Sequence, residues 1–552
     1  MVTGISELES ASNALGAALD EYLDACFATP NPKIASKTES IVCVPNSNSH
    51  EFIAQEYPRA TFFEAQIQRA KAAIGEAINS SSVTAPMKVL PTEVLTRIFR
   101  LAIGTEPCTL NLWPVETQYL VLLTHVCAHW RRIIVGTPLF WTHIDATPHI
   151  YNSERLQDRS RTFLDRAGSA PLELHISTPY PTDEYWEATG LNEFFIPLIP
   201  RIQSLDLDVR IEYTGSYDAC ASAISFASSV LSKCFGTSYL PETLSQASLR
   251  MNICNHIGHL FIESAEAEAE PGDNQLLLEA PETHLRNVWG EIRVLRLASI
   301  FPSWTSIAYS GLVELSLGTY DGYNRVDISV YHLAQILSSS PELRVLDFGL
   351  CIIPSDNLPT AVSLPHLQTL IMRPKSRNDL EYVMRLFTPG SEPLHMAICS
   401  SLADPDETYT TAEIARFFAR SNVATLHFVG ITSCLELLSL VNGLQTLALT
   451  IYSSEDMKSI FAYEKPCHLH PKRLHLLSVN PDELAIDTLL QLAKLYVPQR
   501  LVVWVPYTIT RGPVPKIHST TLVEQELSNI GITGKVVISK SLNPTEYSLM
   551  SF

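Results

Sequence analysis

The sequence is poor in basic residues and lacks the short motifs that carry phosphate, metal or nucleophilic chemistry. Lysine and arginine total 39 against 58 aspartates and glutamates, which gives a formal net charge of -19. This balance excludes nucleic acid as the expected partner, because phosphate binding requires a basic face. The chain has no Gly-x-Ser-x-Gly, no P-loop, no His-Glu-x-x-His and no Gly-x-Gly-x-x-Gly after a strand. We therefore expect a protein that is not an enzyme and that uses no cofactor.

Signals for secretion and for structural zinc are also absent. The eleven cysteines are scattered, and no two of them form a Cys-x-x-Cys pair. The first residues carry no basic segment followed by an apolar run, so we predict no signal peptide. No stretch is predicted to be long and apolar enough to span a bilayer, which takes ~18–20 residues. We therefore predict a protein of the cytoplasm, the nucleus or both, with free thiols and no membrane partner.

Two short segments contain groups of possible metal ligands. In the first, His125 and His129 lie four residues apart with Cys127 between them, so the two imidazoles could share a metal if one helix ran through them. The second group is Glu464, Cys467, His468 and His470, which lie within seven residues of one another. Structural zinc sites usually join two separated ligand pairs, so we predict no metal site in either group.

The 552 residues are enough for several domains, and 46% of them are hydrophobic. We divide the chain into N-terminal helices and a linker at 1–85, a small domain at 86–145, and a long repetitive region at 146–552. A helix is predicted over 5–26, a linker over 29–49, and a second helix from a capping box at Thr61 to the serines at 80–82. These helices either pack on the next domain or self-associate as a coiled coil.

The small domain begins with Leu90-Pro91-Thr92-Glu93, which opens a short apolar helix. Pro91 suits the first turn, where its missing N–H costs nothing, and Glu93 favours the positive end of the helix dipole. A second apolar segment leads to Val126-Cys127-Ala128-His129-Trp130-Arg131, and Leu139-Phe140-Trp141 closes the unit. Helices this short cannot bury all their apolar faces on one another, so we expect a surface left for a partner.

These motifs resemble the F-box, the adaptor-binding module of SCF-type ubiquitin ligases. The segment Thr105 to Gln118 is longer than the usual linker and resembles the F-box-like variant of fungal proteins. The resemblance implies that the domain binds the SCF adaptor and, through it, a cullin. The residues assigned to the adaptor contact are Leu90, Pro91, Val94, Ile98, Phe99, Val126, Cys127, Trp130 and Trp141.

From about residue 200 an apolar-x-x-apolar-x-apolar signature recurs, with most steps of roughly 20–35 residues. The copies are Ile202/Leu205/Leu207, Ile257/Leu260/Ile262, Ile292/Leu295/Leu297, Leu312/Leu315/Leu317, Leu343/Leu346/Phe348, Leu367/Leu370/Met372, Leu394/Ala397/Cys399, Val423/Leu426/Phe428, Leu444/Leu447/Leu449 and Leu474/Leu477/Val479. Helical segments are predicted between them at 330–337, 380–387, 411–419, 435–440, 457–463 and 483–496. The signature resembles degenerate leucine-rich repeats, which implies an irregular solenoid with parallel strands and outer helices.

Because side chains alternate along a strand, the fourth and sixth residues of each signature should share the core face. The intervening residues should then face the opposite side as an exposed surface for a target protein: Arg296, Ser316, Asp347 and His427.

The predicted fold is α/β overall, with a helical F-box-like unit followed by repeats. The predicted function is that of a substrate-recognition subunit of an SCF-type ubiquitin ligase, in which the repeats bind an unknown target protein. The alternative is a non-catalytic scaffold whose F-box-like unit is only structural.

Overall fold

The computed structural model describes most of the chain in segments. They are residues 2–28, 47–80, 87, 90–104, 119–148, 150–178, 194–210, 217–236, 244–252, 258–266, 274–320, 325–355, 359–399, 411–429, 435–451, 454–463, 469–477, 486–506 and 520–539. The chain separates into two compact units, Met1–Pro86 and Met87–Phe552. The predicted domains 86–145 and 146–552 thus lie together in the second unit.

The first unit consists of two helices, α1 (Val2–Ala28) and α2 (Ser47–Ser80). The Tyr22 hydroxyl donates a hydrogen bond to Glu56 over 3.3 Å, and its ring lies edge-on against Phe63. The predicted start of the second helix at Thr61 is wrong. The Thr61 hydroxyl bonds the carbonyl of Tyr57 inside α2, so this residue does not cap a helix end. Most of the predicted linker lies outside the described residues.

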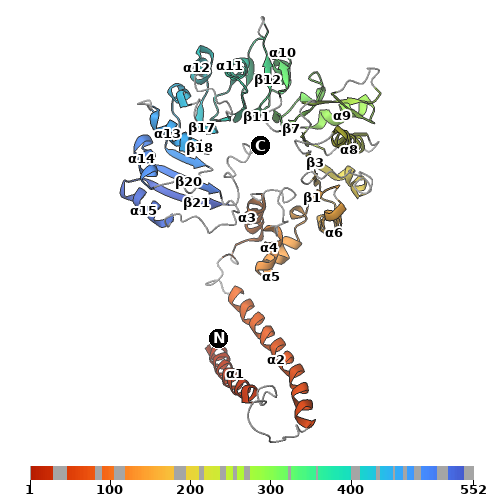
Figure 1. Ribbon diagram of the computed structural model, residues 1–552, viewed down its shortest axis with the longest axis vertical. Helices are drawn as coiled ribbons and strands as arrows, with labels where there is room; N and C mark the ends of the chain where they lie inside the picture. Colours follow the sequence, from red (N-terminus) through yellow and green to blue (C-terminus); the bar gives the residue numbers. More distant parts are fainter. Residues whose placement is uncertain are drawn as a thin grey trace, which may run out of the picture. The chain divides into compact units, whose positions relative to one another are not determined.

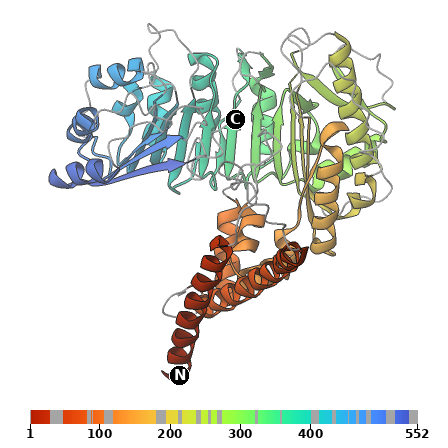
Figure 2. The ribbon, with the colours of Figure 1, turned by 60° about the horizontal axis from the view of Figure 1, so that its bottom comes forward.

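The second unit contains a mixed α/β arrangement around one parallel sheet of 14 strands (Figures 1 and 2). In sheet order the strands are β1 (His143–Ala146), β2 (Leu172–Ser177), β3 (Ile202–Val209), β4 (Gln246–Met251), β7 (Val294–Ala298), β9 (Glu314–Gly318), β11 (Val345–Phe348), β14 (Thr369–Met372), β16 (Leu394–Cys399), β17 (Val423–Val429), β18 (Thr446–Thr450), β19 (Arg473–Leu477), β20 (Arg500–Pro506) and β21 (Thr533–Ser539). Spatial order follows chain order throughout, so the sheet has no reversal of the kind that forms a doubly wound ligand crevice.

Three small sheets are formed by strands that come, along the chain, between the strands of the large sheet. They contain β5 (Leu260–Ser264), β6 (Gln275–Leu278) and β8 (Ile300–Pro302); β10 (Asp327–Ser329) and β12 (Cys351–Ile353); and β13 (Val362–Leu364) and β15 (Phe387–Pro389). Leu260 and Ile262 of the predicted signature Ile257/Leu260/Ile262 belong to β5 and therefore not to the large sheet, and Ile257 lies outside the described residues.

Helices occupy the connections between strands, and α8 to α14 lie along one side of the large sheet in Figure 1. The helices of this unit are α3 (Thr92–Gly104), α4 (Tyr119–Val126), α5 (Ala128–Val135), α6 (Ile150–Ala167), α8 (Tyr217–Gly236), α9 (Glu282–Glu291), α10 (Val330–Ser338), α11 (Arg377–Leu386), α12 (Ala412–Arg420), α13 (Ser454–Ala462), α14 (Ile486–Tyr496) and α15 (Thr520–Asn529), with short 3-10 turns η3 (Pro138–Phe140), η4 (Ile196–Arg201), η5 (Ile307–Tyr309) and η6 (Leu435–Leu440). Ser329, Ser376 and Thr411 cap α10, α11 and α12 by accepting backbone N–H bonds.

The predicted core rungs are confirmed in the middle of the sheet. Leu295, Leu315 and Leu346 are cross-strand neighbours, and so are Leu426 and Leu447 on later strands. All five are fully buried in one core that also contains the inward residues of the helices. In these five signatures, the alternation of side chains along a strand therefore places the fourth position on the helix-covered face.

Two predicted signatures have the wrong register. On β16 the core pair is Met396 and Ile398, because these residues oppose Leu370 and Met372, and Ala397 faces the other side. A register shift between Leu394 and His395 accompanies this slip. On β19 the core pair is Leu474 and Leu476, whereas Leu477 belongs to a separate cluster on the opposite face. A one-residue slip moves every side chain to the other face.

The described cysteines only partly match the prediction of free thiols. Cys26, Cys127, Cys234, Cys351 and Cys399 are free, and Cys220 is disulfide-bonded.

One described helical segment, Ala219–Gly236 in α8, is long and apolar enough to span a membrane, contrary to the sequence interpretation. Half of it is buried in the protein, and Phe226, Val230 and Leu231 are in the main core.

Candidate functional site

Helix α3 has two apolar stripes, one buried and one exposed. Leu95 and Phe99, four residues apart, are fully buried in the core. Val94, Ile98 and Leu101 follow one another at spacings of four and three residues and are 42%, 37% and 65% exposed. Residues at these spacings lie on one face of a helix, so the exposed stripe is a continuous apolar strip along α3.

Helix α4 contacts α3 and has exposed apolar residues of its own. Leu122 and Val126 are 47% and 54% exposed, whereas Leu120 is buried beneath them. We call the five residues Val94, Ile98, Leu101, Leu122 and Val126 the α3–α4 surface. Large apolar side chains gathered on two adjacent short helices are typical of a binding site for a protein partner.

The residues assigned to the adaptor contact divide into three groups. Pro91, Val94, Ile98 and Val126 are exposed, and Leu90, Cys127 and Trp130 are partly buried. Phe99 and Trp141 are buried, so their assignment to an exposed contact is wrong. The predicted long loop at 105–118 lies outside the described residues.

The buried aromatic residues stabilise the unit and join it to the sheet. Trp141 follows η3 at the start of the sheet, and its indole N–H donates a 2.8 Å hydrogen bond to the carbonyl of Ile134. Its ring lies edge-on to Phe163 of α6, and the guanidinium of Arg166 is 4.2 Å from its centroid. Phe99 packs against Trp130 at a centroid distance of 4.7 Å. These contacts explain why Phe99 and Trp141 are buried, because each fills the interface between elements.

Cys127 has a local structural role. It lies between α4 and α5, with an extended backbone, and its thiol accepts the backbone N–H of Trp130 as the N-cap of α5. The helix break at Cys127 also separates His125 from His129, so these histidines do not lie on one continuous helix. Of the second ligand group, Glu464, Cys467 and His468 lie outside the described residues.

The residues assigned to the target contact lie on the predicted face of the sheet. Arg296 is the cross-strand neighbour of Ser316, and Ser316 is the neighbour of Asp347. Further along the same row, His427 opposes Ala397 and Ala448. This face, opposite the helix-covered core, is called the inner face here.

Exposure of this row differs from the prediction. Arg296 and Ser316 are half-buried, but Asp347 is 5% exposed and His427 is fully buried. Asp347 accepts hydrogen bonds from Arg373 at 3.0 Å and from Ser316 at 3.1 Å. Burial raises the pKa of Asp347, while Arg373 and Ser316 oppose this shift.

The side chain of His427 is also held by a neighbouring polar group. Its Nε2 lies 2.7 Å from the hydroxyl of Thr450. Burial, together with the charge of His475, lowers the pKa of His427 to about 3, so its imidazole is neutral at physiological pH. Asp347 and His427 are therefore structural residues of the inner face.

The inner face changes character along the sheet. On β7 to β11 it carries the polar residues Arg296, Ser316 and Asp347, with Arg296 paired to Glu314. Beyond β11 the row continues through Ile371, Ala397, His427, Ala448 and His475. Ile371, Ala397 and Ala448 form a second buried apolar cluster with Leu477.

Among the described residues, one group of side chains has the composition and spacing of metal ligands: His143, Asp145 and His175. His143 and Asp145 lie on β1, and His175 lies on β2. The sequence analysis missed them because 30 residues separate Asp145 from His175. The pairing of the two strands brings them together.

Comparison with protein-family models and with curated proteins found no match for this sequence. The F-box-like interpretation therefore depends on the motifs and on the α3–α4 surface.

Proposed function

We propose that the protein is a substrate-recognition subunit of an SCF-type ubiquitin ligase, acting in the cytoplasm, the nucleus or both. The α3–α4 surface would bind the adaptor, which links the chain to a cullin. The repeat region, proposed to be an irregular leucine-rich-repeat solenoid, would hold the target protein. The chain would act by proximity, since it raises the effective concentration of the target near a conjugating enzyme bound elsewhere in the complex.

The exposed stripe of α3 is the observation that carries this proposal. The same helix buries Leu95 and Phe99 and leaves Val94, Ile98 and Leu101 in solvent. Exposing three large apolar side chains has a solvation cost that a bound partner would remove. The Leu-Pro-x-Glu opening and the Cys-x-x-Trp-Arg segment supply the resemblance that identifies the partner as the SCF adaptor.

The test is adaptor binding by the full-length chain. Ile98→Glu places a charge in the centre of the exposed stripe without touching the buried one, and we expect it to weaken binding by about 2 kcal/mol, roughly 30-fold. Ile353→Glu is the matched control, because Ile353 is 49% exposed on β12, outside α3–α5. The measurement is affinity by isothermal titration, with circular dichroism spectra confirming that both variants are folded.

Unchanged affinity of a folded Ile98→Glu variant would contradict the contact assignment. The alternative function is a non-catalytic scaffold in which α3–α5 only close the β1 end of the core. The burial of Trp141 and Phe99 between these helices and the sheet favours that role. Absence of adaptor binding by the unaltered chain would support the scaffold and contradict the ligase subunit.

A further inference from the structure

Four ionisable side chains occupy adjacent positions on the first two strands. His143 pairs with Glu173 across the strands, and Asp145 pairs with His175. Residues two apart on a strand share a face, so all four project from the inner face. Ile144, which lies between His143 and Asp145 on β1, is buried in the main core on the opposite face of the sheet.

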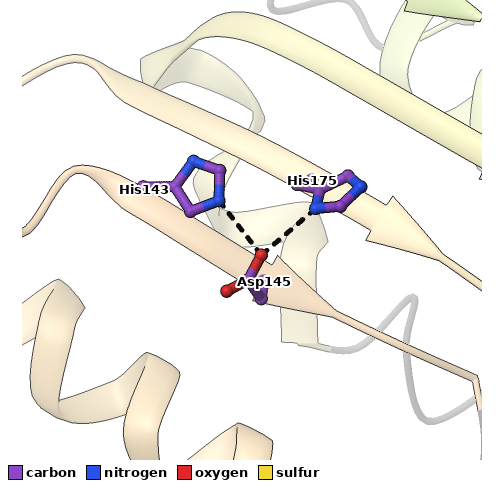
Figure 3. Close-up of side chains that lie close together, drawn as sticks. All are labelled: His143, Asp145 and His175. Carbon is purple, nitrogen blue, oxygen red and sulfur yellow. Dashed lines mark hydrogen bonds and ion pairs between the residues drawn. The ribbon is translucent and has the colours of Figure 1, made fainter. Parts of the chain in front are cut away.

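Two of these side chains, His143 and His175, point toward one carboxylate oxygen of a third, Asp145, as Figure 3 shows. His143 Nε2 lies 3.1 Å from Asp145 Oδ1, and His175 Nδ1 lies 3.2 Å from the same oxygen. The three ligand atoms lie within 4.8 Å of one another. Asp145 and His175 are almost completely buried, whereas the His143 side chain is 40% exposed. The group is therefore anchored inside the protein and reachable from solvent through His143.

The carboxylate of Asp145 is oriented by a second set of contacts. Arg159 of α6 donates a 2.8 Å hydrogen bond to Oδ2, the oxygen that the histidines do not approach. The Ser160 hydroxyl donates to the backbone carbonyl of Asp145 at 2.8 Å. These bonds hold Oδ1 toward the two imidazoles, as outer contacts commonly do for the ligands of metal sites.

We propose that His143, Asp145 and His175 form a binding site for a divalent transition-metal ion, with Zn²⁺ as the best fit. Two imidazoles and one carboxylate are a common zinc ligand set. Metal–ligand bonds of ~2.0–2.2 Å in a tetrahedron separate ligand atoms by about 3.3–3.6 Å, and the two imidazole nitrogens lie 3.1 and 3.2 Å from Asp145 Oδ1. The ligand atoms of His143 and His175 lie within 4.8 Å of each other.

Without an ion, the same geometry is maintained by hydrogen bonds from the imidazoles to Asp145. A metal ion would take the place of the two hydrogens in those bonds, and each neutral imidazole would then carry its hydrogen on its other ring nitrogen. The Arg159 charge opposes a cation at this place, and the exposed Glu173 carboxylate, 3.6 Å from His143 Nδ1, adds a compensating negative charge. Three protein ligands leave a coordination position for water or for a group of a bound protein.

The experiment is titration of the metal-free full-length chain with ZnCl₂, followed by calorimetry and by melting temperature. We expect one equivalent to bind and to raise the melting temperature, because an ion that binds only the folded state stabilises it. His143→Ala should abolish both effects, and its partial exposure makes a folded variant expected. His366→Ala is the control, because His366 is also half-exposed and beside a carboxylate, Glu342, away from this group.

His175→Ala, tested in the same way, separates the site from a general surface effect. Loss of the Zn²⁺-dependent rise in melting temperature in the His143 and His175 variants, with retention in His366→Ala, supports the site. Absence of Zn²⁺ binding by the unaltered chain overturns the proposal. Unchanged binding by a folded His143→Ala variant also overturns it, because the ion is then held elsewhere.

Discussion

Substitutions at two consecutive residues of β11, Leu346 and Asp347, can test which side chains of the sheet face the core. Leu346 is fully buried between Leu315 and Leu370 on the flanking strands. Replacing it with alanine removes three carbons and leaves a cavity in a closely packed rung. Leu→Ala changes at such positions cost about 2–5 kcal/mol. We expect the free energy of unfolding to fall by that amount, measured by urea unfolding with circular dichroism.

The adjacent residue gives the second half of the test. Sequence alternation predicts an exposed Asp347, whose replacement by alanine would hardly change stability. In the structure Asp347 is buried, and its removal leaves Arg373 and Ser316 without their acceptor. Arg373 retains about a fifth of its side-chain exposure and can partly rehydrate, so we expect a loss of about 1–3 kcal/mol.

Ile353→Ala is the control for both variants, because Ile353 is half-exposed and its truncation should cost about 1 kcal/mol. If Leu346→Ala were no less stable than Ile353→Ala, the assignment of Leu346 to the core rung would be wrong. If Asp347→Ala matched the unaltered protein, the buried pairing with Arg373 would be refuted, and the exposed inner face predicted from the sequence would be correct.

Three further outcomes follow from the structure. Trp141→Ala should lower the free energy of unfolding by about 3–5 kcal/mol in urea titrations, because it empties the contact with Phe163; a loss below 1 kcal/mol would contradict this. Although burial acts in the other direction, hydrogen bonds from His143 and His175 hold the pKa of Asp145 well below its usual value of 3.8. Its contribution to stability is therefore complete above pH 3.8 and lost as the pH falls below it, so the deficit of Asp145→Asn in melting temperature should shrink below about pH 4, and a constant deficit would refute the shift. A maleimide at neutral pH should label the exposed Cys26 at once and Cys234 only after unfolding, because Cys234 is buried and burial raises its thiol pKa to about 12; mass spectrometry of labelled peptides distinguishes them, and equal rates would contradict the burial.

Local periodicity was sufficient to predict which side chains face the core where a signature had large apolar residues at all its apolar positions. Leu315 and Leu317, or Leu447 and Leu449, can face the core only if the strand has the observed phase, because side chains alternate with a period of two. The helices α10 and α12 were also predictable, since their apolar residues recur at helical spacing after a capping Ser329 or Thr411.

The sequence pattern assigned the wrong side chains to the core where apolar residues occupy both faces of a strand. Ala397 and Leu477 belong to the second apolar cluster, and the sequence alone assigned them to the main core. Strand β4 escaped detection because Ala247 replaces a large residue in its signature, although it is the neighbour of Leu295 in the sheet. A pattern of hydrophobicity cannot distinguish two buried faces.

The sequence by itself determined the class of the fold and the apolar character of α3, but not which apolar residues of α3 are exposed. Both depend on periodicity within a short segment, which is a local property of the chain. Only the tertiary structure decided which polar residues are buried and which ones meet. The buried Asp347 is paired with Arg373, the residue that follows β14. His175 reaches Asp145 because β1 and β2 pair in one particular register. Such contacts join residues far apart in sequence, so their formation depends on how the strands assemble and not on any segment alone.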